Sequence, residues 1–367
     1  MKIQISNGMF IAMILNIMYV KAIGVTQGVL ARVAGQDMWL ATLFGTLEGV
    51  VLVYLTYVVI RRTPDKDYIQ LGQLMLGRWL SSIVALAIFA FFLAAFGPIM
   101  ITFVYHLRDY FLPDAPLWIF VATSLIVGAI GCYYGLEVMG RVAVIGLLFI
   151  FTLNVLITLG SLQEFDIWNL LPVMESGLPK TAKASMHYLA DCAMATMMGT
   201  LILPLVKNVE KGHGRFGVLG ILGSGLVITI WAILEGAVLS AEVTSQYTLS
   251  CMKLARNAHL GTFLQRYEMI MIALYSLPAL FEVMFCIYGT SVSMSRIFGL
   301  KSNRPMILPC CIVLGLFGYW VIEDHFRALD YLENYWPYIG LPIAIGLPIV
   351  MLLLRVLLSH KLQRKSA

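Results

Sequence analysis

Six ionisable side chains stand out by their position in the long apolar stretches of this 367-residue sequence. They are Lys21, Glu48, Asp191, Glu235, Glu268 and Glu282. A charge in hydrocarbon is costly, so an ionisable residue inside a membrane-spanning segment is a functional candidate by default. The chemistry open to these groups is ion pairing, binding of a polar ligand, or transfer of a proton between carboxyl groups.

Glu282 stands in the middle of a long apolar run, between Phe281 and Phe285. We expect either a carboxylate that binds a ligand or an ion beside aromatic walls, or a protonated acid that is hydrogen-bonded between helices. Lys21 also has two interpretations. It is a pocket residue paired with Glu282 or Asp191, or a cation that snorkels or pairs to pack helices.

Lys21, Glu48, Asp191 and Glu235 together form a candidate charge network inside the membrane. Burial raises the pKa of a carboxyl group, so a proton relay through these residues is one interpretation. Structural pairing between helices is the other, and the spacing does not choose between them.

The first apolar run, residues 10–33, is interrupted by the polar and small residues of 21–28. Gly24 and Gly28 stand there with Lys21, Thr26 and Gln27. Irregular backbone survives in lipid only where it lines a protein-enclosed cavity, and transporters place such breaks at their binding sites. The alternative is that the two glycines form a small-residue face for helix packing.

The composition places these residues in a polytopic membrane protein. Hydrophobic residues make up 60% of the chain and charged residues 12%, against roughly a quarter charged in soluble domains. The net charge of +5 comes from Lys and Arg residues that are distributed unevenly between the two sides of the membrane, and it does not indicate nucleic-acid binding. We find no enzyme motif, no metal-ligand spacing and no cofactor signature, so we expect neither an enzyme nor a metalloprotein.

Ten apolar runs are long enough to cross the hydrocarbon, which takes about twenty residues each. They cover residues 8–33, 38–60, 80–111, 117–134, 138–160, 184–206, 215–241, 263–295, 305–322 and 336–358. The chain is thus expected to be one transmembrane domain, 1–367. Two five-helix repeats, about 8–160 and 184–358, would have opposite orientations in the membrane. Lys and Arg in the short loops place both termini in the cytoplasm.

Several motifs in order resemble the B subunits of GerA-type spore germinant receptors. They include Ile23-Gly24-Val25-Thr26-Gln27-Gly28, Ala34-Gly35-Gln36-Asp37-Met38-Trp39, Leu76-Gly77-Arg78-Trp79, Tyr134-Gly135-Leu136-Glu137, Leu203-Pro204 and Arg266-Tyr267-Glu268. That family belongs to the amino-acid/polyamine/organocation transporter superfamily. The resemblance implies an all-α fold of ten helices in a five-plus-five inverted repeat, with helices 1 and 6 broken.

The resemblance also implies a function, a location and partners. The chain would sense a nutrient germinant in the inner membrane of the spore, working with a membrane A subunit and a lipoprotein C subunit. The ligand-binding residues implied are Gly24, Ala95, Ala195 and Glu282, with the neighbours Ile23, Val25, Phe96, Gly97, Thr196 and Phe281.

Two departures from the family pattern concern the ligand. Ala31-Arg32 lacks the proline that often follows the first break, and Glu282 is unusual in a pocket for a neutral side chain. An amino acid, a sugar or a cation therefore remains open as the germinant. A proton- or cation-coupled amino-acid transporter is the alternative function, and a structural scaffold without a pocket is a third.

Overall fold

The computed structural model describes residues 4–61, 63–207, 214–259, 261 and 266–358, which fold almost entirely into helices. The β structure in these residues is one isolated bridge between Ile5 and Val206. The apolar runs form α1 (Asn7–Lys21), α2 (Gln27–Ala34), α3 (Met38–Ile60), α5 (Arg78–Tyr110), α6 (Leu117–Tyr134), α7 (Leu136–Ser161), α8 (Gly177–Ile202), α9 (Gly214–Leu239), α12 (Tyr267–Ile297), α13 (Arg304–Glu323) and α15 (Trp336–Leu357).

Shorter helical pieces connect these runs. The short α-helices are α4 (Tyr68–Leu76), α10 (Ala241–Gln246), α11 (Ser250–Asn257) and α14 (His325–Asp330). The 3-10 segments are η2 (Gly35–Asp37), η3 (Leu162–Glu164), η4 (Ile167–Leu170) and η5 (Leu203–Leu205), and the two π-helical segments are η1 (Ala22–Thr26) and η7 (Tyr331–Tyr335).

Nine helical runs in the described part of the chain are long and apolar enough to cross a membrane. The first run has 54 residues, whereas one crossing needs about twenty. Gly35, with φ of +55°, lies between α2 and α3 and divides this run, because glycine adopts positive φ without steric cost. Counting the run as two crossings gives ten. The count of ten, the inverted repeat and the single-domain boundaries stay predictions.

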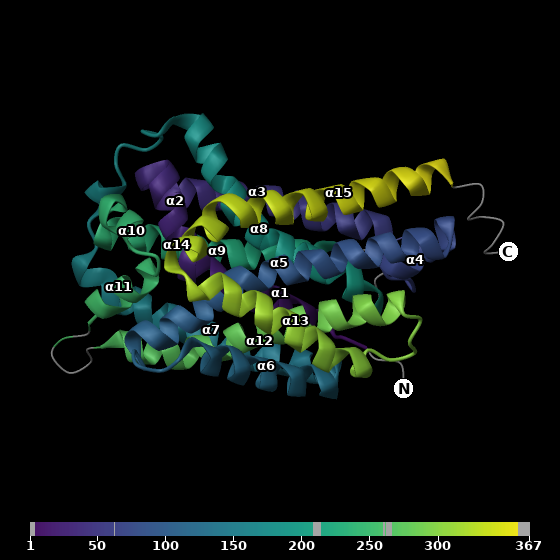
Figure 1. Cartoon of the computed structure of the whole chain (residues 1–367). Coiled ribbons are helices and arrows are strands. Elements are labelled where there is room, and N and C mark those ends of the chain that lie inside the picture. Colours follow the sequence, from purple (N-terminus) through teal and green to yellow (C-terminus); the bar gives the residue numbers. More distant parts are fainter. Residues whose placement is uncertain (1–3, 62, 208–213, 260, 262–265, 359–367) are drawn as a thin grey trace.

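The helices lie side by side along one direction, with α10 and α11 together at one end of the bundle (Figure 1). Both described ends of the chain lie at the opposite end (Figure 1), which agrees with the predicted even number of crossings. The sequence predicts that both termini lie in the cytoplasm. Residues 1–3 and 359–367 are outside the described part, so this stays a prediction. Helices α1 and α8 are buried over most of their length, whereas α6, α7, α13 and α15 expose large apolar side chains on one face. In a membrane, that face meets lipid.

Two details of the expected helix breaks need correction. The interruption of the first span is real, but it is a π-helical turn rather than an unwound segment. The sixth helix is not broken, since α8 is α-helical from Gly177 to Ile202. Its polar residues stay in the helix because Thr196 and Thr200 donate to backbone carbonyls one turn earlier (3.2 and 2.7 Å).

Candidate functional site

The π-helical turn η1 places backbone carbonyl groups where side chains of other helices reach them. A π turn shifts backbone bonding from the fourth to the fifth residue, so some carbonyls lose their intrahelical donor, and in hydrocarbon they need partners from the protein. Three side chains supply these bonds: Tyr275 Oη donates to Val20 O (2.9 Å), Gln27 Nε2 to Ala22 O (3.2 Å) and Cys251 Sγ to Gly24 O (3.7 Å). The protein itself therefore supplies donors to the carbonyls of Val20, Ala22 and Gly24.

A buried ion pair joins the first span to α8. Lys21 Nζ contacts Asp191 Oδ1, and the two side chains are 7% and 1% exposed. Thr26 Oγ1 donates to Asp191 Oδ2 (2.7 Å), and Lys21 Nζ lies 3.2 Å from the same hydroxyl. On α15, the Trp336 ring faces Lys21 Nζ, 5.7 Å from the ring centroid, which is cation–π geometry. Of the partners expected for Lys21, the structure selects Asp191.

The Glu282 carboxyl lies next to this turn and is 1% exposed. Among the described residues, neither of its oxygens has a hydrogen-bond partner. Its polar neighbours are the backbone of Val20 and Lys21, which approach the carboxyl without a well-formed hydrogen bond, and the side chains of Lys21 and Asp191. Buried polar groups are nearly always hydrogen-bonded, so an unbonded carboxyl in the centre of a bundle needs an explanation.

Three residues that the sequence analysis did not single out complete the site. His106 on α5 stacks on Tyr275 of α12, with ring centroids 4.5 Å apart, and its Nε2 lies 3.3 Å from Cys251 Sγ. His106 Nδ1 donates to Thr102 O (2.6 Å). The sequence signal that could have identified His106 is its spacing from Thr102, since residues four apart lie on one face of an apolar helix.

The residues expected to form the pocket are buried and lie on η1, α5, α8 and α12, which pack together. They are Ile23, Gly24, Val25, Ala95, Phe96, Gly97, Ala195, Thr196, Phe281 and Glu282. The space beside Gly24 is filled, since a Cβ there would lie 2.8 Å from Tyr275 Oη and 3.3 Å from His106 Cε1.

Two of these residues face away from η1. A Cβ on Gly97 would lie 2.9 Å from the Tyr331 ring of η7, and the Phe96 ring packs against Gly318 of α13. The expected wall on α5 is therefore divided, and Phe96 and Gly97 belong to the opposite side of that helix.

The candidate charge network is also divided. Glu48 on α3 is exposed, and its Oε2 accepts from Ser185 Oγ (3.2 Å). Glu235 on α9 is fully buried, and the Ser250 hydroxyl approaches its carboxyl without a well-formed hydrogen bond. Neither residue contacts the Lys21–Asp191 pair among the described interactions. Glu268 pairs with Arg266 at the start of α12 (3.3 Å).

The arrangement of helices defines the class of protein. The chain is similar to Mhp1, a nucleobase-cation-symport-1 family transporter solved in a closed conformation with bromovinylhydantoin bound (TM-score 0.68, 13% identity, 95% of this chain and 78% of that one). It is also similar to a Na⁺-coupled sialic acid symporter solved in a substrate-bound outward-open state (TM-score 0.59, 12% identity, 94% and 85%). The fold is that of membrane transporters of this kind.

Within this class, residues 4–326 match the family described as Spore germination protein, and the chain belongs to that family. Spore germination protein KB of Bacillus subtilis (strain 168) is 23% identical over 88% of this chain and 87% of its own. Spore germination protein GerQB of Bacillus cereus is 21% identical over 88% of each. The chain is therefore an integral membrane protein with a permease-like fold, and its relatives are germination proteins rather than enzymes.

Proposed function

We propose that this chain is the ligand-sensing subunit of a spore germination receptor and that it binds a small polar germinant beside η1. The observation that carries the proposal is the buried Glu282 carboxyl, which has no hydrogen-bond partner among the described residues and lies next to the π-helical turn. An unbonded carboxyl at this depth is costly to retain unless a ligand uses it.

The germinant would enter by replacing the side chains that now bond to the turn. Tyr275 and Cys251 donate to the carbonyls of Val20 and Gly24, and a ligand with an ammonium or hydroxyl group offers equivalent donors. Glu282 would accept from the same ligand. The Lys21–Asp191 pair would hold η1 against α8 while Tyr275 and His106 move aside.

Such an exchange makes the chain a switch. A ligand shifts a conformational equilibrium only by binding one state more tightly than the other, and here the two states differ in whether side chains or ligand bond to the turn. We further propose that the shift is passed to a membrane A subunit and a lipoprotein C subunit in the inner spore membrane, with both termini in the cytoplasm.

A direct binding screen tests the proposal. Amino acids, sugars and monovalent cations are titrated into the purified chain, and the screen is repeated with Glu282→Gln. We expect one class to bind and the substitution to weaken it by about tenfold or more, the effect of losing a charged hydrogen bond. Glu48→Gln, which alters an exposed carboxyl, is the matched control. Equal binding to both variants would remove Glu282 from the site.

Coupled transport is the second candidate, because the structural neighbours include a cation symporter family member and a Na⁺-coupled symporter. Concentrative uptake of the bound compound into vesicles that contain only this chain would establish transport. Saturable binding without uptake supports the receptor.

A further inference from the structure

A space opens on the side of the bundle, around the other π-helical turn, η7. Its volume is about 740 Å³, which is within the usual range for small-molecule sites. It lies between α5, α13, α14, η7 and α15, and most of its lining is apolar or aromatic. The lining residues are Ala90, Leu93, Ala94, Phe317, Trp320, Phe326, Arg327, Asp330, Tyr331, Tyr335 and Ile339.

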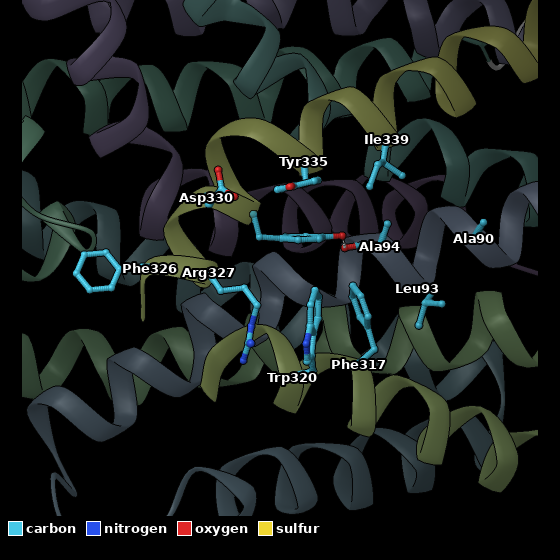
Figure 2. A pocket seen from close by; sticks show the side chains of 11 residues that line it. Ala90, Leu93, Ala94, Phe317, Trp320, Phe326, Arg327, Asp330, Tyr335 and Ile339 are labelled. Atoms are coloured by element: carbon cyan, nitrogen blue, oxygen red, sulfur yellow. Dashed lines mark hydrogen bonds between the residues drawn. The ribbon is translucent and has the colours of Figure 1, made fainter. Parts of the chain in front are cut away.

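The side chains that line the space are spread out along the direction of α5 (Figure 2). Phe326 and Arg327 lie at one end of it and Ala90 at the other, with Leu93 and Ala94 between. Its outer edge is formed by side chains that are exposed on the bundle surface, among them Trp320, 49% exposed. Lipid chains are the solvent at that surface, so a long apolar space that opens there fits an acyl chain.

The end near α14 carries opposite charges. The Arg327 guanidinium lies 4.8 Å from the centroid of the Trp320 ring. Its Nε and Nη2 are buried and have no hydrogen-bond partner among the described residues, while the side chain as a whole is 30% exposed. The Glu323 carboxylate stands 3.5 Å from Nη2, as an ion pair. Asp330 accepts from Asn334 Nδ2 (2.8 Å) through one oxygen. The mouth thus offers a phosphate-binding cation and a carboxylate within one turn of helix.

We propose that this pocket binds a phospholipid with a zwitterionic headgroup, its acyl chain along α5, its phosphate at Arg327 and its ammonium at Asp330. Arg binds phosphate through paired N–H donors, and pockets between helices with such a cation bind lipid headgroups. A headgroup with net negative charge fits less well because Glu323 and Asp330 both lie near Arg327.

Photolabelling of the unaltered full chain tests the placement. The chain is reconstituted with phosphatidylethanolamine that carries a photoreactive group in the acyl chain, and labelled peptides are mapped. We expect label in peptides that contain Leu93, Phe317 and Ile339. Label spread evenly over α6 and α7, or label that appears equally with a free fatty acid of the same length, would overturn the proposal.

Two variants then test the headgroup and the chain separately by native mass spectrometry. Arg327→Gln is expected to lower retention of phosphatidylethanolamine by about tenfold, and Leu93→Trp to lower it similarly by filling the pocket. Arg304→Gln is the matched control for the cation, since Arg304 lies 4.5 Å from the Tyr133 ring centroid elsewhere. Leu148→Trp, on the exposed face of α7, is the control for bulk.

Three outcomes contradict the proposal. The first is unchanged retention of phosphatidylethanolamine in both pocket variants. The second is equal retention of phosphatidylglycerol with the same acyl chains. The third is that the pocket variants lose binding to a second membrane protein while their lipid retention is unchanged. The last would assign this face to a partner helix. Germinant binding, measured on the same samples, separates this result from the proposed function.

Discussion

The two π-helical turns of this protein have opposite surroundings. At η1, three side chains from other parts of the chain or from its own span donate to freed carbonyls, and the space beside Gly24 is filled. At η7, no described side chain donates to the carbonyls of Tyr331–Tyr335, and the turn lines an open pocket. A π turn in a membrane helix therefore does not by itself mark a cavity. The neighbouring side chains decide whether ligand or protein occupies the space.

Breaking the ion pair at η1 should have the largest effect on stability. Lys21→Met leaves Asp191 as an unpaired charge at 1% exposure, so we expect a loss of about 3–5 kcal/mol in the free energy of unfolding. Denaturation in mixed micelles measures it. Combining Lys21→Met with Asp191→Leu should recover most of the lost stability. If the double variant is as unstable as Lys21→Met alone, the two residues do not act as a pair.

Filling the space at Gly24 tests whether η1 is the ligand site. Gly24→Leu would contact Thr102, Tyr275 and His106, so we expect a loss of about 1–3 kcal/mol from overpacking and at least about a tenfold loss of germinant binding. Titration of the purified variant measures the binding. Gly223→Leu on α9, where no atom lies within 4 Å of the added Cβ, is the control. Unchanged binding by Gly24→Leu would exclude this location.

The two tyrosines that bond to freed carbonyls allow a direct comparison between the turns. Tyr275 donates to Val20 O, and Tyr331 donates to Ala94 O (3.0 Å), which lacks a helical donor because Pro98 has no N–H. Each Tyr→Phe substitution should lower stability by about 1–3 kcal/mol. Tyr275→Phe alone should also tighten germinant binding, because the ligand no longer competes with the hydroxyl. Titration of both variants gives the answer, and equal affinities would mean that Tyr275 does not close the site.

The smallest effect on stability is expected from breaking the ion pair between Arg32 of α2 and Glu333 of η7. Arg32 Nε lies 2.7 Å from Glu333 Oε1, with the side chains 28% and 35% exposed. Because the pair is partly solvated, Glu333→Gln should change stability by less than about 1 kcal/mol. Denaturation at low and high salt measures the change, which should shrink as salt is added. A larger, salt-independent loss would show that η7 depends on the pair for its shape.

The sequence allowed the spans and the interrupted first helix to be predicted, because hydropathy and the residues at 21–28 are local signals. For Lys21 it offered Asp191 or Glu282 as a partner, and a snorkelling or helix-packing cation as the alternative. It did not predict that the interruption would be π-helical and closed, since His106, Tyr275 and Cys251 reach η1 only through tertiary packing. The pocket at η7 was missed as well. The one local signal there was Pro337, which cannot donate to Glu333 O and so favours a change of helix type just before it.

The contacts of α15 with the first span have a mechanical consequence. Trp336 faces Lys21, and Glu333 binds Arg32, so η7 and the start of α15 are attached to the first span at two separate heights. A rotation of the first span alone would break both attachments. A movement of the first span that keeps both contacts must therefore carry η7 and the start of α15 with it.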